Sequence, residues 1–226
     1  AKELDDKNGI AISLNNIGII YRHKGDYDKA LDFYEKSLVI KQNIGDKSGM
    51  GSSLNNIGIV HADKGNFNKA LDFYGRSFII KKELGDKRGM GLTLNNIGIV
   101  HDDNKDFDKA LNFYEKSLAI RKELGDKHGI GTTLNNIGIV YRQKGEYEQT
   151  LSYYNGSLKI FEELGNKHGI GSSLNNIGNI YSEKGDYEQA LNYFNRSLTI
   201  SEELDEKEQI FNSLHNIGNV YHEKGD

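Results

Sequence analysis

The 226 residues of the chain include no cysteine, no proline and no tryptophan. Without cysteine the chain can form neither a disulfide nor a thiolate site, which favours a reducing compartment, so we expect a cytoplasmic protein. Its apolar runs are only a few residues long, too short for a membrane span, so we expect no membrane partner. The 29 basic and 33 acidic residues are interspersed, which gives no one-signed surface for nucleic acid.

What the sequence does contain is a stretch, Leu-Asn-Asn-Ile-Gly, that recurs every forty residues. It begins at Leu14, Leu54, Leu94, Leu134 and Leu174, and a variant with histidine at its second position begins at Leu214. Self-similarity at such a period is typical of solenoids, whose repeats bury their apolar faces against their neighbours. We therefore expect residues 1–226 to form a single array of about five repeats followed by one unpaired helix.

Both ends of the sequence fall inside a repeat. Residues 1–6 align with the end of a repeat, and Gly225-Asp226 align with the middle of one. We expect the sequence to be a piece of a longer array, with any attached domain outside it. The apolar residues Leu214, Ile217 and Val220 of the last helix would then lack a covering helix, which predicts weak end-to-end association.

Residues 46–84 serve as the type repeat and predict two helices. Apolar or small residues at Met50, Leu54, Ile57 and His61 are spaced as on one face of a helix. Asp46 follows a glycine and precedes this pattern, which is the position of an N-cap. The same position is occupied in the following repeats by Asp86, Asp126 and Asn166.

The first helix is expected to end near Gly65, because glycine adopts the left-handed conformation without a steric penalty. Asn66 would open the second helix, and both helices would be about 28 Å long. Small residues at Gly58 and Ala70 would let the two helices approach closely. The expected inward positions of the second helix are Phe67, Ala70, Leu71, Tyr74, Phe78 and Leu84.

These residues resemble the tetratricopeptide repeat (TPR) family. The residues that fall at its signature positions are Leu174, Ile177, Gly178, Tyr181, Gly185, Tyr187, Ala190, Phe194 and Ser197. The chain departs from the family in its longer period and in lacking the proline that ends the second helix. The long form resembles Pins-family adaptors, kinesin light chains and sensor regions of bacterial signalling proteins. WD40 blades have a similar period but need strands and tryptophan, and HEAT repeats do not match the Gly, Tyr and Ala positions.

The resemblance implies an all-α TPR solenoid, a right-handed superhelix of antiparallel helix pairs whose first helices line a concave groove. In the resembling adaptors the second asparagine of each pair binds the ligand backbone. This carries over to Asn16, Asn56, Asn96, Asn136, Asn176 and Asn216. The first asparagines are weaker candidates, and they are Asn15, Asn55, Asn95, Asn135 and Asn175. Asparagine is a mediocre helix former, so its repeated use inside a helix needs a reason, and a ladder of amide hydrogen bonds between repeats is the alternative.

Further groove positions carry isoleucine at Ile19, Ile59, Ile99 and Ile139, and asparagine at Asn179 and Asn219. The isoleucines would anchor apolar side chains of a partner or pack between neighbouring helices, while the last repeats would offer only polar contacts. Arg22 and Arg142 add positive charge to a groove that otherwise carries several acidic residues. The lysine and arginine clamp of chaperone-binding TPR domains is absent, since the corresponding positions are Asn15, Asn55 and Asn95, or Ile12, Ser52 and Leu92.

The sequence gives little support for catalysis, a cofactor or a metal. Its histidines recur at repeat spacing, too far apart for shared coordination, and His61 and His101 replace the tyrosines Tyr21 and Tyr141, which favours a half-buried structural role. The run from Gly85 to Gly91 lacks the ending of a phosphate loop and instead predicts a helix start.

We therefore expect a non-enzymatic module that binds a peptide or helical segment of another protein, or of its own parent chain. The alternatives are a self-associating scaffold and the sensor region of a larger bacterial signalling enzyme.

Overall fold

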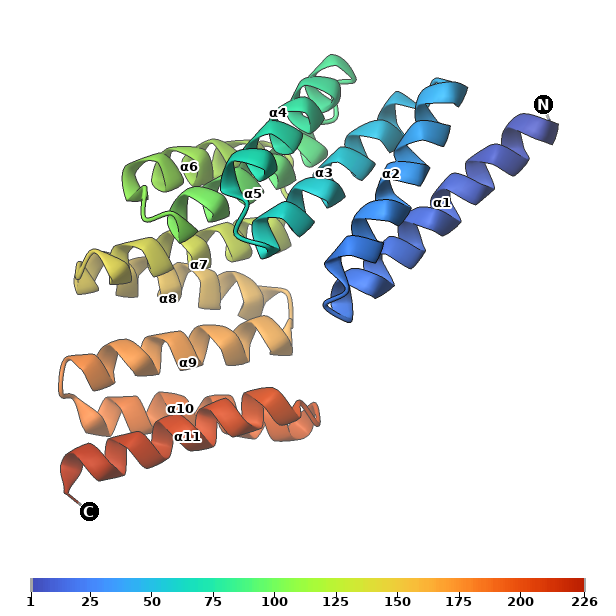
Figure 1. Cartoon of the computed structure of the whole chain (residues 1–226). Helices are drawn as coiled ribbons and strands as arrows, with labels where there is room; N and C mark the ends of the chain where they lie inside the picture. Colours follow the sequence, from blue (N-terminus) through green and yellow to red (C-terminus); the bar gives the residue numbers. More distant parts are fainter. Residues whose placement is uncertain (1, 226) are drawn as a thin grey trace. The chain divides into compact units, whose positions relative to one another are not determined.

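The computed structural model describes residues 2–225, and all the regular structure in this range is helical (Figure 1). The helices, in chain order, are α1 (Lys2–His23), α2 (Tyr27–Ile44), α3 (Lys47–Asp63), α4 (Phe67–Glu83), α5 (Lys87–Asp103), α6 (Phe107–Glu123), α7 (Lys127–Gln143), α8 (Tyr147–Glu163), α9 (Lys167–Glu183), α10 (Tyr187–Glu203) and α11 (Lys207–Lys224). They form sequential antiparallel pairs joined by short turns, which confirms the all-α TPR solenoid expected from the sequence. The 17-residue helices are about 26 Å long.

Four of the first helices, α3, α5, α7 and α9, begin at the predicted N-caps. The carboxylate of Asp46 accepts a hydrogen bond from the backbone N–H of Gly49, at 2.8 Å. The equivalents Asp86, Asp126 and Asn166 do the same for the glycine three residues on. Because the first N–H groups of a helix have no partner within it, these caps fix where the helix starts.

The turns that end the helices use the left-handed conformation. Gly65 has a φ of 71°, as predicted from its place after α3. The same conformation is kept by Lys105, with a φ of 61°, and by Asp205, with a φ of 52°. A side chain other than glycine therefore does not change the turn at these two positions.

Within each helix pair, a glycine of the first helix accommodates an aromatic ring of the second. A β-carbon placed on Gly58 would lie 2.7 Å from the ring of Tyr74, and one on Gly98 would lie 2.6 Å from the ring of Tyr114. These distances are too short for real contacts, so any larger residue would displace the ring. The small residue expected at Gly58 is explained by this ring packing.

A buried serine also links the two helices of each pair. The hydroxyl of Ser77 on α4 donates a hydrogen bond of 2.7 Å to the backbone carbonyl of Gly51 on α3. The same bond recurs in other repeats from Ser37, Ser117, Ser157 and Ser197. Satisfying the hydroxyl in this way allows a polar side chain to be buried at no net loss of hydrogen bonding.

One predicted inward position is wrong. Leu84 is exposed, because α4 ends at Glu83 and Leu84 already belongs to the turn. The other inward positions of α4 are at least half-buried, with Ala70 and Tyr74 in the core. The inward face continues instead through Ser77 to Lys81, which the apolar pattern did not identify.

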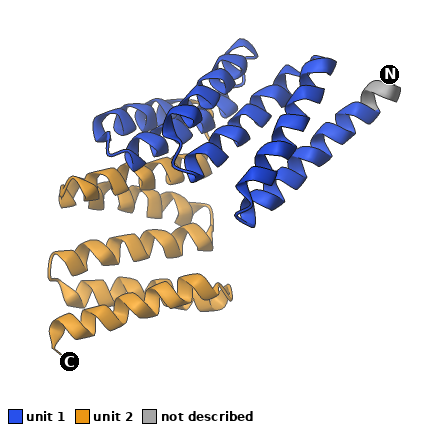
Figure 2. Ribbon diagram, in the orientation of Figure 1, with its two compact units in different colours: residues 1–120 blue, residues 121–226 orange. Residues whose placement is uncertain are grey.

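The chain divides into two compact units, residues 1–120 and residues 121–226, coloured separately in Figure 2. In the first unit, one core cluster joins Tyr34 and Leu38 of α2 to Leu54, Ile57 and Val60 of α3. In the second, Tyr154 and Leu158 of α8 pack on Leu174, Ile177 and Ile180 of α9. Each core therefore lies between one repeat and the next, and the single array over residues 1–226 stays a prediction.

The last helix is partly covered. Val220 of α11 is buried against Ala190 and Phe194 of α10, so the expectation that it would be uncovered is wrong. Ile217 packs at the edge of the same cluster, whereas Leu214 is exposed as expected. Val220 is buried because it lies on the face of α11 that packs against α10.

Candidate functional site

Neighbouring first helices contact each other through residues that are 41 positions apart in the chain. In the first unit, Arg22 of α1 forms an ion pair with Asp63 of α3, at 2.7 Å between Nε and Oδ2. In the second unit, Arg142 of α7 pairs with Glu183 of α9, at 2.9 Å from Nε to Oε1. This offset defines which residues of successive repeats face each other.

The asparagines follow the same offset and form a ladder in the first unit. The amide nitrogen of Asn56 donates to Oδ1 of Asn15 at 3.0 Å, and that of Asn96 donates to Oδ1 of Asn55 at 3.3 Å. In each bond the second asparagine of one repeat is the donor and the first asparagine of the preceding repeat is the acceptor. The inter-repeat amide bonds considered as an alternative therefore exist.

The second unit repeats this arrangement. Asn176 donates to Oδ1 of Asn135 at 2.8 Å, and Asn175 donates to the hydroxyl of Ser213 at 3.1 Å. The two members of a pair thus differ in the direction of their bonds. The second asparagine reaches back toward the preceding repeat, and the first lies on the side of the following one.

The first asparagines are the more deeply placed members. Asn55 and Asn95 are each only 4% exposed, whereas Asn56, Asn96, Asn136, Asn176 and Asn216 are half-buried and Asn16 is exposed. In Asn56 and Asn96 the carbonyl Oδ1 accepts no hydrogen bond from any described residue. These oxygens are free to accept an N–H from outside the chain.

Beneath the ladder lies a buried polar network that contains a lysine. The ammonium of Lys81, on α4, donates to the hydroxyl of Thr93 at 2.8 Å, and Thr93 in turn lies 3.3 Å from Oδ1 of Asn55. Lys41 makes the equivalent bond to the hydroxyl of Ser53, at 3.0 Å. Burial lowers the pKa of both lysines, opposed by the carboxylate at the next N-cap.

A pocket of about 460 Å³ opens between the first helices of the first unit. We call it the α1–α3–α5 pocket, and its lining residues are Arg22, Ile59, Ala62, Asp63, Tyr74, Asn96, Ile99 and Asp103. Its volume lies in the range of pockets that hold small ligands. Three of the predicted groove positions, Ile59, Asn96 and Ile99, thus line one cavity together with Arg22.

The α1–α3–α5 pocket contains three charged side chains, of which two form an ion pair with each other and one does not. Hydrogen bonding to Asp63 raises the pKa of Arg22, so this pair is internally neutralised. Asp103 has no ion-pair partner among the described residues, and its pKa is raised by burial and by the nearby charge of Asp63. Tyr74 is 2% exposed, and burial is the main cause of its raised pKa.

The second unit has pockets of a different character. One of about 440 Å³ is lined only by polar residues of α9 and α11, among them Asn175, Asn176, Asn179 and Asn216. Asn179, at the position that Ile59 has in the first unit, belongs to this polar lining. A second pocket, of about 610 Å³, has Asn219 and Glu223 in its lining.

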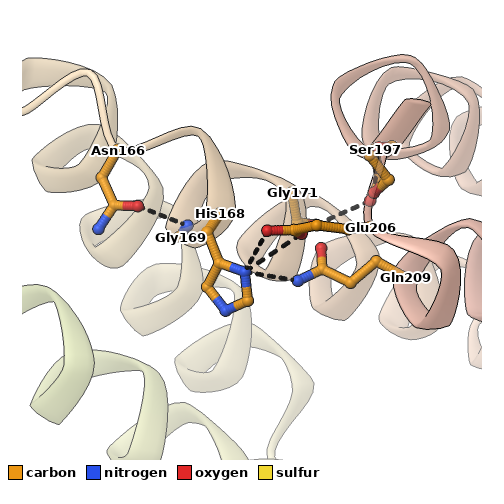
Figure 3. A network of polar contacts seen from close by, with 8 residues as sticks. Asn166, His168, Gly169, Gly171, Ser197, Glu206 and Gln209 are labelled. Carbon is orange, nitrogen blue, oxygen red and sulfur yellow. Dashed lines mark hydrogen bonds and ion pairs between the residues drawn. The ribbon is translucent and has the colours of Figure 1, made fainter. Parts of the chain in front are cut away.

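At the rim of the polar pocket, His168 is held by α11. Its Nδ1 lies 3.0 Å from Oε1 of Glu206 and 2.8 Å from Nε2 of Gln209, as Figure 3 shows. Next to it, Asn166 caps α9 at Gly169, and Ser197 bonds to the carbonyl of Gly171. The histidine therefore belongs to the contact between two repeats, and we assign it no catalytic role.

Two other histidines have the structural role predicted for them. The rings of His61 and His101 stack on Phe73 and Phe113, with centroid distances of 5.3 and 5.4 Å. Tyr21 stacks on Phe33 in the same manner, at 5.4 Å. Burial lowers the pKa of His61, which favours its neutral form.

Among the residues that the structure describes, no group of three or more histidine, aspartate or glutamate side chains is placed to hold a metal ion. No helix in this part of the chain combines the length and apolar character needed to cross a bilayer.

The predicted site residues thus separate into four groups. Ile59, Ile99, Asn96 and Arg22 line the α1–α3–α5 pocket, while Asn175, Asn176, Asn179 and Asn216 line the polar pocket of the second unit. Asn55 and Asn95 lie beneath the surface. The remaining predicted residues, among them Ile19 and Ile139, line neither of these pockets, and a ligand-binding role for any member stays a prediction.

Sequence reasoning did not assign Tyr74 or Asp103 to the site. Tyr74 carries an ordinary core pattern, and Asp103 was one of several mixed charges. The sequence feature that could have identified Asp103 is the offset of 41 residues between facing positions of neighbouring first helices. This offset pairs Arg22 with Asp63 but places the uncharged Ala62 opposite Asp103.

Comparison with known proteins identifies the repeat. The profile of the family described as Tetratricopeptide repeat matches residues 9–83, 49–123, 129–203 and 169–226. No curated protein matches the sequence.

Several solved structures share the fold. A signal transduction ATPase with numerous domains and a tetratricopeptide repeat sensor, from Pyrococcus horikoshii, has a TM-score of 0.81 and 19% identity over 93% of this chain and 32% of its own. A Rap protein solved in complex with Competence and Sporulation Factor has a TM-score of 0.79 and 15% identity over 92% of this chain and 62% of its own. A Podosopora anserina protein described as a putative kinesin light chain with nearly identical TPR-like repeats has a TM-score of 0.67 and 12% identity, over 88% of this chain and 97% of its own.

Proposed function

Since this chain belongs to the tetratricopeptide repeat family, we propose that it is a binding module that takes a peptide or helical segment of another protein against its first helices. The observation that carries the proposal is the α1–α3–α5 pocket, where apolar side chains of Ile59 and Ile99 stand beside the free carbonyl oxygen of Asn96. A pocket that combines apolar anchors with a few placed polar groups is typical of ligand sites.

The asparagine row supports an extended or helical backbone as the ligand. Asn56 and Asn96 use their amide nitrogens within the chain and keep Oδ1 for a ligand N–H. Because these oxygens recur from one repeat to the next, they match a ligand whose own backbone groups recur. The inter-repeat bond holds each amide in place, so binding would not have to order it.

The comparisons support the same class of function. The Rap protein was solved with Competence and Sporulation Factor bound, and the ATPase carries its repeats as a sensor. We extend from these only the class, which is recognition of another protein or peptide. The sensor region of a larger signalling enzyme is a form of this proposal in which the ligand controls an attached domain.

The proposal can be tested by selecting binders from a displayed library of random twelve-residue peptides, with the 226-residue chain as bait. Selected peptides should bind the chain and lose affinity for the double variant Ile59→Asn and Ile99→Asn. This variant reproduces the residues that the chain itself has at Asn179 and Asn219, so it should fold. Ile79→Asn is the matched control, because Ile79 is exposed on α4 and does not line the pocket.

Binding that is lost in the double variant and kept in Ile79→Asn would support the proposal. A selection that yields no binders, or binders that both variants retain equally, would overturn it. Circular dichroism melting curves of each variant ensure that lost binding does not reflect lost structure.

A further inference from the structure

We propose that the α1–α3–α5 pocket binds the guanidinium side chain of an arginine in the ligand, with the carboxylate of Asp103 as its ion partner. This inference rests on the proposed function, since the arginine belongs to the bound peptide. It goes further by naming the side-chain chemistry that the pocket selects.

The first argument is a missing cation in a periodic arrangement. At the offset of 41, Arg22 faces Asp63 and Arg142 faces Glu183, and both pairs are joined by ion pairs. The same offset places Ala62 opposite Asp103, so this carboxylate lacks the arginine that the other two acids have. Asp103 has no ion-pair partner among the described residues, and the pocket at that point is open.

The second argument is the hydroxyl of Tyr74. Tyr74 is only 2% exposed and lines the pocket, and its hydroxyl makes no hydrogen bond to any residue in the described part of the chain. The hydroxyl oxygen is not sealed from solvent, so a ligand that enters the pocket can reach it. A guanidinium has five N–H donors, so it can pair with a carboxylate and still donate to the hydroxyl oxygen.

The third argument concerns the walls of the pocket. Ala62 and the isoleucines Ile59 and Ile99 present apolar surface, which suits the three methylenes of an arginine stem. An anionic ligand group is disfavoured for two reasons. Arg22 is already paired with Asp63, and the carboxylate of Asp103 would repel the anionic group. Both the shape and the charge of the pocket therefore favour a long cationic side chain.

The second unit supplies a natural comparison. At the offset of 41, Glu223 faces Ser182 and also lacks an arginine, but the surrounding residues differ. Phe194 stands where Tyr74 does and has no hydroxyl, and Asn179 and Asn219 replace the two isoleucines. We expect arginine selectivity only in the first unit.

The test uses three capped tripeptides that differ at the central residue: acetyl-Ala-Arg-Ala-amide, its citrulline analogue, which is neutral and nearly isosteric, and its glutamate analogue. They are titrated into the 226-residue chain with ¹³C-labelled isoleucine methyl groups. The arginine peptide should shift the methyl signals of Ile59 and Ile99 and leave that of Ile79 in place. Citrulline should weaken binding by about tenfold, the effect of losing one charge-assisted hydrogen bond.

Two variants locate the effect. Asp103→Asn should remove the preference for arginine over citrulline, and Tyr74→Phe should weaken arginine binding by a few fold, about the effect of one neutral hydrogen bond. Tyr74→Phe introduces the residue found at Phe194, so it should fold. Glu223→Gln is the control and should leave the response of Ile59 and Ile99 unchanged.

The proposal is overturned if the citrulline or glutamate peptide binds as well as the arginine peptide. It is equally overturned if Asp103→Asn keeps the arginine preference, or if no arginine-dependent shift appears up to the solubility limit. Should these outcomes occur while the peptide library still yields binders that depend on Ile59 and Ile99, this inference fails and the proposed function stands. If the library also yields none, both fail.

Discussion

At the scale of the residue, Lys105 occupies a turn position where most repeats have glycine, yet its φ of 61° is close to that of Gly65. A left-handed conformation costs a residue with a β-carbon roughly 1–2 kcal/mol. Glycine removes this strain but gains entropy in the unfolded chain, which offsets part of the benefit.

We therefore expect Lys105→Gly to raise the free energy of unfolding by roughly 0.5–1 kcal/mol in a denaturant titration. Lys105→Ala serves as the control and should change little, because alanine keeps the β-carbon that causes the strain. A Lys105→Gly variant that is no more stable than the alanine variant would contradict this account.

Lys81 is a second residue in an unfavourable environment, because burial disfavours its charged form. It is 6% exposed, and burial lowers its pKa, opposed in part by Asp86. Because the unfolded chain holds this proton up to a higher pH than the folded chain, folding becomes more favourable as pH rises between the two pKa values. Below that interval the protein carries the full cost of a buried charge.

Lys81→Met is accordingly expected to stabilise the chain by about 1 kcal/mol near neutral pH, since well-packed apolar residues often replace buried charges without loss. The second unit already has Phe161 at this position. The gain should shrink as the pH rises toward the ordinary lysine pKa, because the native lysine loses its proton below that value. Lys82→Met, at an exposed neighbour, should show no such pH dependence, and a loss of stability in Lys81→Met would mean that its bond to Thr93 outweighs desolvation.

At the scale of the helix, the asparagine ladder joins α1 to α3 and α3 to α5. The two asparagines of each bond differ in burial and in the number of hydrogen bonds they make. Oδ1 of Asn55 accepts from both Asn96 and Thr93, and Asn55 is buried. Asn96 contributes one hydrogen bond and is half-buried. Removing Asn55 leaves the amide of Asn96 without its acceptor, while Thr93 keeps its bond to the carbonyl of Gly89. Removing Asn96 leaves Asn55 still bonded to Thr93.

Asn55→Ala should therefore lower the free energy of unfolding by roughly 1–3 kcal/mol, because a buried, hydrogen-bonded side chain is lost and the amide of Asn96 loses its acceptor. Asn96→Ala should cost less than about 1 kcal/mol, because alanine also improves helix propensity. Denaturant titrations without ligand compare the two. A loss above about 1.5 kcal/mol for Asn96→Ala would assign that residue to stacking rather than to ligand binding.

Much of the helix architecture could be predicted from the sequence. The period, the two helices of each repeat, the N-caps and the turn at Gly65 follow from spacing and from the conformational properties of glycine and aspartate. Burial of Ser77 and Lys81 could not be predicted in this way. Their polarity is compensated by a backbone carbonyl and by the hydroxyl of Thr93, which lie on other helices and leave no trace in the local pattern.

The candidate site was predictable in part for a related reason. The positions Ile59, Asn96 and Ile99 were identified by their recurrence, and they do line one pocket. The direction of the asparagine bonds depends on the offset of 41 rather than 40 between neighbouring helices. That offset arises from how the helices pack, which no single repeat encodes.

At the scale of the whole chain, apolar side chains remain exposed on α11, the last helix described. Phe211 is 68% exposed and Leu214 is 52% exposed, while on α1 Ile12 and Ile20 are also exposed. Apolar surface of this kind favours association. We expect α11 of one copy to meet α1 of a second copy, a head-to-tail contact.

The 226-residue chain should consequently show weak, concentration-dependent association in sedimentation velocity, and Leu214→Glu should reduce it. Ile79→Glu, which charges an exposed isoleucine on α4, should leave association unchanged. A chain that sediments as a monomer at every concentration tested would exclude the contact.

The hydrogen bonds within and between repeats also bear on how the protein is made. The serine bond spans 26 residues, and the asparagine bond spans 41. Each repeat leaving the ribosome can therefore complete its bonds to the repeat before it while the next is still being translated. Because no bond of either kind waits for a distant part of the chain, synthesis and folding can advance together, one repeat at a time.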